Sequence, residues 1–362
     1  MRYFLELCLK SVQDATSNID AEIIVVDNNS EDDSCSMVKA LFPKVTLIEN
    51  KTNSGFSKGN NIGVKIAKGE YICILNPDTV VAEDTFIKLL KFADSKDNLG
   101  IVGCKLINGI GCFLPESKRN IPFVKSALLK LVGNSNRYYA NHLKENETGK
   151  VDVFVGAFMF MKKTVYTEMN GFDEDYFMYG EDIDLSYKVL KAGYNSYYFP
   201  ETTIIHYKGE STLRDKNYAK RFYGAMQIFY KKHFKKNVLF DFLVWLGIKM
   251  AYLLRFKPEE KPKQVSKYIF VSNNNKIAPK QFLSRPLVLD YKTEFIEDYD
   301  EVIFDANVLS YKKIITLIEE LRKNKTITFK ILPKQSNFII GSDNAIDRGA
   351  VLKWDSVLFK TS

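Results

Sequence analysis

Cysteine and histidine are scarce in this chain, and neither is arranged as in a structural metal site. The five cysteines form no Cys-x-x-Cys pair, and only three histidines are present. An odd number of scattered cysteines argues against a disulfide framework and favours reduced, mostly buried thiols in a cytosolic compartment. The apolar N-terminus is interrupted by Glu6 and Lys10, so we expect no signal peptide and activity on the cytoplasmic side.

Internal repeats, low-complexity tracts and long uncharged apolar runs are also absent from the 362 residues. Hydrophobic residues make up 46% and charged residues 27% of the sequence, which predicts an ordered protein, and the length predicts more than one domain. Much of the net charge of +8 lies in lysines and arginines between residues 231 and 267, beside the most apolar stretch. This pairing favours an anionic membrane surface as a partner and argues against nucleic acid.

Strand and helix patterns alternate through the first part of the chain. We expect strands at residues 21–28, 45–49, 70–75, 101–107 and 151–161, and helices at 32–41, 58–67, 85–92 and 182–192. Such alternation predicts an α/β fold, a doubly wound and mostly parallel sheet flanked by helices. The polar region 108–150 is expected to form loops and short helices, and binding specificity often resides in such loops.

The last third of the sequence has a different character. An amphipathic helix is expected at 218–234, followed by an apolar segment at 238–256 that contains Asp241, Lys249 and Arg255. These charges favour in-plane membrane attachment, with a spanning helix and a buried helix as the alternatives. A Pro-rich linker precedes a small α/β domain without a catalytic motif. We therefore predict a catalytic domain at 1–215, amphipathic helices at 216–257, and a linker with a small domain at 258–362.

Two acidic motifs about a hundred residues apart carry the chemistry of the chain. They are Asn76-Pro77-Asp78, which follows an apolar strand, and Glu181-Asp182, which begins a helix. One carboxylate can hold a divalent cation on a diphosphate while the other takes a proton from a hydroxyl. Taken separately, the first motif could be an ordinary turn and the second an ordinary helix cap.

Six motifs in a fixed order include these carboxylates. They are IIVVDNNSEDDS (23–34), NSGFSKGNNIG (53–63), GEYICILNPDT (69–79), VGAFMFMKK (155–163), GFDEDYFMYGEDIDL (171–185) and HYKGEST (206–212). In that order and spacing they resemble the family 2 glycosyltransferases, particularly the bacterial rhamnosyltransferase-like branch. The resemblance covers about the first two-thirds of the chain and implies the A-type glycosyltransferase fold, a nucleotide-binding α/β sandwich.

The resemblance implies a donor-binding role for residues in the first three motifs. They are Asp27, Asn29, Asn53, Gly55, Asn61 and Asn76. Asp27 ends an apolar strand, where a carboxylate can face the crevice of an open α/β sheet and bind a base or ribose. A turn followed by a helix cap is the alternative interpretation of this segment.

A metal site and an acceptor site are implied in the same way. Asp78 would be the main charged ligand of Mg²⁺ or Mn²⁺, and His206 either completes the metal site or is an ordinary core or surface histidine. Asp182 matches the catalytic base of the family. Glu181, Asp173 and Tyr179 are expected to bind or wall the acceptor, beside aromatic side chains that can stack on sugar faces.

The sequence thus predicts an inverting, metal-dependent glycosyltransferase. It would move a sugar from a nucleotide-diphosphate donor, with dTDP-rhamnose as one candidate, to a hydroxyl of a lipid-linked or cell-surface glycan. A non-catalytic sugar-nucleotide-binding assembly protein is one alternative. A nucleotidyltransferase is a weaker alternative, because the chain has no Gly-rich, Lys- or Arg-bearing first loop.

One expected element has no counterpart in this sequence. Family members normally begin with an apolar strand ahead of a helix that resembles residues 3–12, and here Met1 falls almost directly on that helix. We therefore expect an N-terminally truncated version of a protein longer by one strand and its turn, about 5–10 residues. The missing strand would lie centrally in the sheet and contact the nucleotide base.

Overall fold

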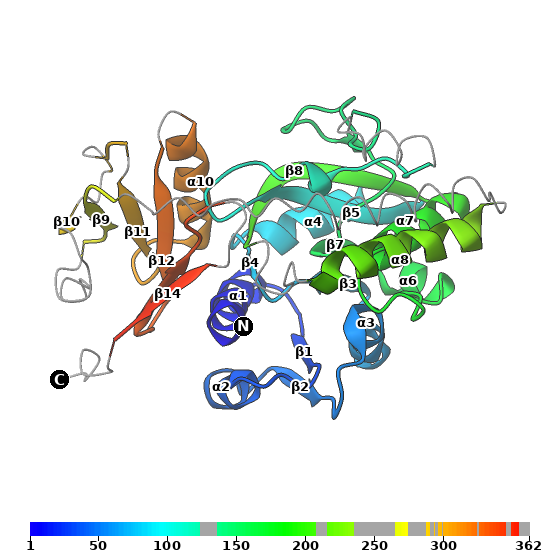
Figure 1. The fold of residues 1–362 in the computed structure, drawn as a ribbon, viewed down its shortest axis with the longest axis horizontal. Coiled ribbons are helices and arrows are strands. Elements are labelled where there is room, and N and C mark those ends of the chain that lie inside the picture. Colours follow the sequence, from blue (N-terminus) through cyan, green and yellow to red (C-terminus); the bar gives the residue numbers. More distant parts are fainter. Residues whose placement is uncertain are drawn as a thin grey trace.

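The computed structural model gives the fold of the chain (Figure 1). It describes residues 1–123, 136–207, 216–234, 265–273, 287–289, 293, 296–298, 300–323, 326–344 and 349–354. The predicted segment 238–256 lies outside these residues, so its membrane attachment stays a prediction. No helix in the described ranges is long and apolar enough to cross a bilayer.

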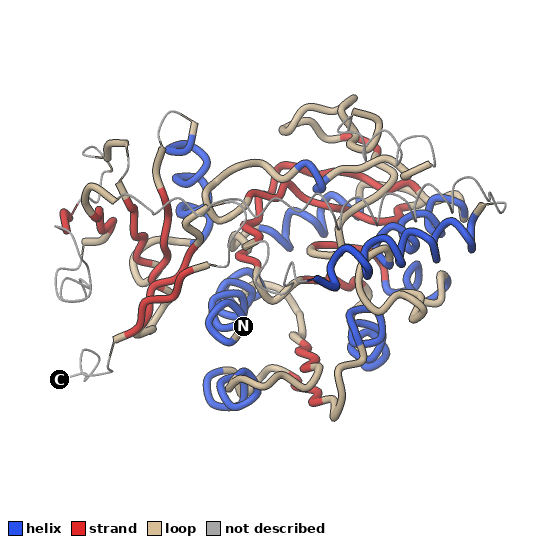
Figure 2. The backbone as a smooth tube through the Cα atoms, in the orientation of Figure 1, coloured by secondary structure: helices blue, strands red, loops and turns tan. Residues whose placement is uncertain are grey.

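Strands and helices alternate through residues 1–233, as the apolar patterns predict (Figure 2). The helices are α1 (Arg2–Thr16), α2 (Ser34–Leu41), α3 (Gly55–Ile66), α4 (Thr85–Asp94), η1 (Pro115–Ser117), α6 (Lys163–Glu168), α7 (Glu181–Lys191) and α8 (Lys216–His233). The strands are β1 (Ile24–Asp27), β2 (Thr46–Glu49), β3 (Tyr71–Leu75), β4 (Thr79–Val80), β5 (Leu99–Ile107), β6 (Gly149–Lys150), β7 (Phe158–Lys162) and β8 (Asn195–His206). The predicted α/β class is confirmed.

The main sheet has the order β3-β7-β5-β8-β4, with β6 paired to β8. It is mixed rather than mostly parallel, because β7 runs antiparallel to both β3 and β5, and β4 and β6 run antiparallel to β8. The strand predicted at 151–161 begins only at Phe158, since Gly156 and Ala157 form a turn. Upstream of that turn, Val153 pairs with Arg119 instead of extending β7.

Strands β1 and β2 form a separate two-stranded parallel sheet. Among the described residues, β1 pairs only with β2 and β3 pairs only with β7, so each has an edge without a strand partner. Helix α1 lies beside this break (Figure 1). Its Leu5 and Leu9 pack with α2 and the β1–β2 sheet, whereas Cys8 and Val12 pack toward the main sheet. Helix α1 therefore contributes to a separate hydrophobic cluster on each side of the break.

The C-terminal part forms a second sheet with the order β10-β9-β11-β12-β13-β14. Its elements are β9 (Tyr268–Val271), β10 (Leu287–Leu289), β11 (Glu301–Asp305), α10 (Tyr311–Arg322), β12 (Thr328–Leu332), β13 (Phe338–Gly341) and β14 (Ala350–Lys353). Strands β9 and β11 are buried along their whole length, as expected for inner parallel strands. A small α/β unit is thus present where the sequence predicts one.

The two sheets share one hydrophobic core. Phe4 of α1, Val80 of β4 and Ile205 of β8 belong to the same buried cluster as Val302 of β11 and Ile314 of α10. Helix α8 packs on the other side of the catalytic part, where Phe229 is fully buried in a cluster with Tyr176 and Ile183. The division at residues 215 and 257 stays a prediction, but both later parts contact the first.

Candidate active site

One cavity of about 1180 Å³ opens between the β1–β2 sheet and the main sheet. Its apolar half is lined by β1, β3 and the side of α1 that carries Leu5, Leu9 and Val12. Its polar half lies at the carboxyl ends of β1 and β3 and at the start of α7. Polar groups of several segments distant in sequence therefore meet around one space, which is the usual arrangement of a binding site in an open α/β sheet.

The carboxyl end of β1 supplies the first group of polar side chains. Asp27 lines the cavity and accepts a hydrogen bond from the Ser30 backbone N–H at 3.0 Å. The Asn28 amide donates to the Gly55 carbonyl at 2.8 Å, which fixes the loop before α3. Asn53 and Gly55 also line the cavity. Asn29, with a left-handed backbone (φ 63°), is not among the lining residues.

Gly55 has a position that only glycine fits. Its φ of 82° is in the left-handed region, and an added Cβ would lie 2.4 Å from the Phe177 carbonyl oxygen. This close approach joins the start of α3 to the aromatic loop 171–180, since the Phe56 N–H donates to that same carbonyl at 2.8 Å. The glycine thus brings the donor side and the acceptor side of the predicted site together.

The Asn-Pro-Asp motif follows β3 beneath the cavity. Asn76 and His206 line the cavity, and the Asn76 amide lies 3.4 Å from His206 Nε2. Asp78 is fully buried, and its Oδ1 lies 3.4 Å from the same Nε2. Among the described residues, no cluster of three or more His, Cys, Asp or Glu side chains is suited to a metal ion. His206 therefore lines the cavity, and the Asp78 carboxylate is buried behind the imidazole, outside the lining residues.

Asp182 is held at the start of α7 by donors from three segments. Arg119 Nη2 donates to Asp182 Oδ2 at 2.6 Å, and the Gly156 N–H donates to the same oxygen at 3.1 Å. The Ile183 N–H donates to Asp182 Oδ1 at 2.8 Å. Both Arg119 and Asp182 are buried and line the cavity. The predicted base is therefore oriented before any acceptor arrives.

Glu181, next to Asp182 in the sequence, is a buried carboxyl that retains its proton to higher pH than an ordinary glutamate. Burial, followed by the negative charge of Asp182, raises the pKa of Glu181 to about 8. Its Oε2 has no hydrogen-bond partner among the described residues. Glu181 is thus a protonated carboxylic acid at neutral pH, and it lines the same cavity.

We expect Glu181→Gln to flatten the dependence of stability on pH. The folded protein holds the Glu181 proton between about pH 4.5 and about pH 8, where the unfolded chain has lost it. The free energy of unfolding of the wild type should therefore fall as the pH rises through this window, by up to about 1.4 kcal/mol per pH unit. Thermal unfolding across this range tests it, with exposed Glu31→Gln as the control; equal pH slopes in the wild type and Glu181→Gln would contradict it.

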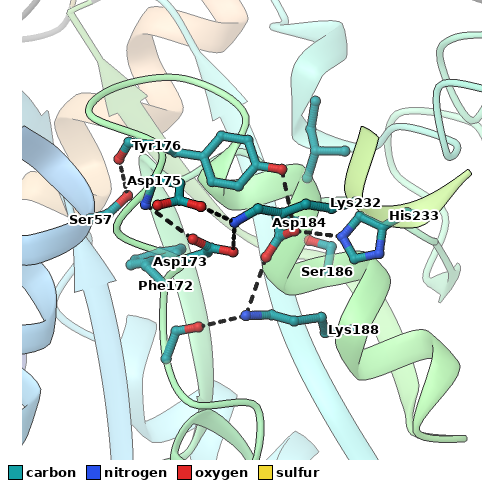
Figure 3. Close-up of polar contacts among 12 residues, drawn as sticks. Ser57, Phe172, Asp173, Asp175, Tyr176, Asp184, Ser186, Lys188, Lys232 and His233 are labelled. Atoms are coloured by element: carbon teal, nitrogen blue, oxygen red, sulfur yellow. Dashed lines mark hydrogen bonds and ion pairs between the residues drawn. The ribbon is translucent and has the colours of Figure 1, made fainter. Parts of the chain in front are cut away.

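The aromatic loop is tied to α7 and α8 rather than left open. Figure 3 shows Asp184, which is buried, accepting hydrogen bonds from His233 at 2.6 Å and from Tyr176 at 3.3 Å. Burial raises the pKa of Asp184, but His233 and Lys188 outweigh it and bring the pKa below its usual value. Asp184 therefore has a structural role, as its place one residue further inside the helix predicts.

Two predicted site residues take part in this structural network instead of lining the cavity. Asp173 forms an ion pair with Lys232 of α8 (Figure 3). The Asn61 side chain accepts from the Phe172 N–H at 3.1 Å and donates to the Phe172 carbonyl at 2.9 Å. Both residues shape the loop 171–180 from behind. The cavity is lined by Met178, Tyr179 and Gly180 of that loop.

Four lining residues from the polar region 108–150 were not predicted from the sequence. They are Glu116, Arg119, Tyr138 and Tyr139. The sequence predicts loops for acceptor specificity in this region, but a single arginine between polar residues has no periodicity that would place it. The pairing of Arg119 with Val153 and Tyr139 depends on contacts between distant segments.

The fold and the cavity define an α/β protein with a polar site at its strand ends. Residues 3–169 match the family model "Glycosyl transferase family 2", and residues 142–210 match "N-terminal domain of galactosyltransferase". The chain therefore carries a family 2 glycosyltransferase domain, and the protein is a glycosyltransferase. Within the family it is rhamnosyltransferase-like, which confirms the resemblance predicted from the six motifs.

Two curated relatives illustrate this similarity. The N-acetylglucosaminyl-diphospho-decaprenol L-rhamnosyltransferase of Mycobacterium tuberculosis is 25% identical over 231 residues, covering 58% of this chain and 74% of the relative. Rhamnosyltransferase WbbL of Escherichia coli is 29% identical over 160 residues, covering 42% of this chain and 61% of the relative. Among solved structures, mannosyltransferase PcManGT from Pyrobaculum calidifontis covers 70% of this chain and is itself covered to 67%, with a TM-score of 0.47 and 19% identity.

Proposed function

We propose that this protein is an inverting, metal-dependent glycosyltransferase of the A-type fold. It transfers a sugar, with rhamnose as the leading candidate, from a nucleotide-diphosphate donor to a hydroxyl of a lipid-linked or cell-surface glycan. The main support for the proposal is that four residues from distant parts of the chain line one cavity: Asp27, Asn76, His206 and Asp182. The relatives from M. tuberculosis and E. coli are rhamnosyltransferases by name, which supports the sugar and the acceptor class.

The donor set beside β3 fits a hard divalent cation. Asp78 Oδ1 and His206 Nε2 lie 3.4 Å apart and would supply one oxygen and one nitrogen ligand. His206 lines the cavity, whereas Asp78 is buried behind it and is not among the lining residues. Mn²⁺ accepts this combination more readily than Mg²⁺, and diphosphate oxygens and water would supply the remaining ligands. When bound, the cation offsets negative charge on the departing nucleoside diphosphate.

The residues of the chain have distinct tasks in the proposed reaction. Asp27 and Asn53 bind the nucleoside part of the donor at the end of β1. Tyr179 and Glu181 face the acceptor, which reaches the cavity beside the aromatic loop. Asp182 accepts the proton of the acceptor hydroxyl as its oxygen attacks the anomeric carbon. The bond from that carbon to the diphosphate oxygen breaks on the opposite face, so the configuration inverts and no covalent glycosyl-enzyme forms.

A panel of nucleotide sugars tests the proposal directly. We expect the cognate donor to raise the thermal unfolding temperature in Mn²⁺ and to lose this effect when EDTA is added, because ligand binding to the folded state stabilises it. Transfer to acceptor should then release a nucleoside diphosphate. Release of pyrophosphate would identify a nucleotidyltransferase, and binding without turnover would identify an assembly protein.

Membrane association completes the proposal. A lipid-linked acceptor requires the enzyme to work at a bilayer, and the basic, apolar stretch around residues 238–256 would attach it to anionic lipids from the cytoplasmic side. This segment lies outside the described part of the chain. The proposal for it rests on composition and on the kind of acceptor.

A further inference from the structure

We propose that Arg119 is the positioning residue of the catalytic base: it holds the Asp182 carboxylate in the orientation that receives the acceptor proton. This inference deepens the proposed function and rests on it, because it assumes that Asp182 is the base. It is carried by the buried contact of 2.6 Å between Arg119 Nη2 and Asp182 Oδ2 at the wall of the cavity.

Arg119 is itself fixed by its backbone. Its N–H donates to the Val153 carbonyl and its carbonyl accepts from the Val153 N–H, both at 3.0 Å. Its guanidinium also donates to the Phe154 carbonyl at 2.6 Å. The side chain therefore has one buried place to lie, and Asp182 is the one carboxylate with which it forms an ion pair among the described residues. A side chain fixed in this way can orient a partner without rearranging.

The charges around Asp182 make this contact necessary. Glu181 and Asp182 are adjacent buried carboxyls, and the other titratable groups that line the cavity near them include Glu116, Tyr138, Tyr139, Tyr179 and His206. Burial alone would lower the pKa of Arg119, but Asp182 and Tyr138 together outweigh burial and raise it. The Arg119 guanidinium is thus one permanent positive charge beside two carboxyl groups, those of Glu181 and Asp182. This guanidinium is the side-chain cation that contacts Asp182 directly.

The remaining hydrogen bonds to Asp182 are backbone contacts. The Gly156 and Ile183 N–H groups satisfy part of the carboxylate but carry no net charge. Loss of the guanidinium would leave Asp182 as a buried carboxylate without a cation, which favours its protonated form. A protonated carboxyl cannot accept the hydroxyl proton, so both the orientation and the ionisation of the base depend on Arg119.

The test compares Arg119→Met with Arg119→Lys in the transfer assay. We expect Arg119→Met to lower kcat by about 10- to 100-fold and to leave the KM for the donor unchanged. The acid limb of the kcat/KM profile should move to higher pH by about one unit or more, because the cation that favours the carboxylate is gone. Arg119→Lys keeps the charge, so it should restore the acid limb while recovering only part of kcat. Lys39→Met removes an exposed cation and is the control.

A measurement without turnover supports the same conclusion. Arg119→Met should lower the unfolding temperature strongly in the wild-type background and much less in the Asp182→Asn background, since the two side chains interact directly. A wild-type acid limb in folded Arg119→Met, or a loss confined to the KM for the donor, would overturn the inference. If Asp182→Asn itself retains transfer, the proposed base is wrong; if it is inactive while Arg119→Met is unaffected, only the role of Arg119 is wrong.

Discussion

Replacing Asp182 with asparagine is expected to abolish sugar transfer while leaving donor affinity nearly unchanged. The amide keeps the shape of the side chain and can still meet Arg119 and Gly156, which donate to this position in the wild type. It cannot accept the proton of the acceptor hydroxyl, and general-base catalysis contributes about 10²- to 10⁴-fold. Steady-state transfer and donor binding by calorimetry, measured on the same preparation, separate the two effects.

Asp184→Asn provides a matched control two residues along the same helix. Asp184 contacts His233 and Lys188 rather than the cavity, so its loss should lower stability and leave the kcat of the folded protein intact. Asp78→Ala should instead weaken metal-dependent donor binding. If Asp182→Asn retains more than about a tenth of the wild-type transfer rate, the loss is smaller than the contribution of a general base. Asp182 would then not be the catalytic base.

An added strand between β1 and β3 is expected to raise both the unfolding temperature and the donor affinity. The facing edges of β1 and β3 have no strand partner among the described residues, and the apolar half of the cavity lies between them. One paired, buried strand would stabilise the fold by several kcal/mol, corresponding to about 5–10 °C for a chain of this size. Its carboxyl end would also supply backbone groups to the nucleotide site.

The direction of such a strand is fixed by the start of α1. Met1 lines the cavity, and its ammonium group pairs at 3.0 Å with Asp32, which follows the carboxyl end of β1. A strand that enters α1 at this point would therefore run parallel to β1 and end at the polar half of the cavity.

The experiment adds an apolar extension of about 5–10 residues and a turn ahead of Met1, on typical strand lengths. An extension of equal length with a central proline is the control, because proline cannot donate to either neighbouring strand. If the apolar extension changes neither the unfolding temperature nor the donor affinity, no strand is accommodated in this gap.

The sequence predicts most of the local structure of the catalytic part. The continuous apolar run of β5 is typical of a buried strand, and the apolar residues of α4 recur with the period of a helix. The strand predicted from Val151 was too long, because hydrophobic character alone does not reveal the turn at Gly156. The antiparallel insertion of β7 between β3 and β5 was also not predicted, since strand order depends on contacts between distant segments.

Some residues of the candidate site can likewise be predicted from the sequence, and others cannot. Residues that end strands or begin helices, such as Asp27, Asn76 and Asp182, can be predicted because their position follows from the element that carries them. Asn61 and Asp173 lie in equally suggestive motifs, yet their side chains turn toward the aromatic loop and α8. Arg119 was missed for the opposite reason, because only the folded chain brings it to Asp182.

The core shared between the two sheets bears on how this protein can change over evolution. Phe4 packs against Tyr207 with ring centroids 5.0 Å apart, and Tyr3 of the same helix packs against Phe338 of the C-terminal sheet at 4.8 Å. Lys10 donates to the Lys334 carbonyl across the same boundary. A C-terminal domain acquired from another lineage would have to match this surface of α1. Substitutions on the two sides should therefore be inherited in compensating pairs, and the domains should diverge together rather than be exchanged as independent modules.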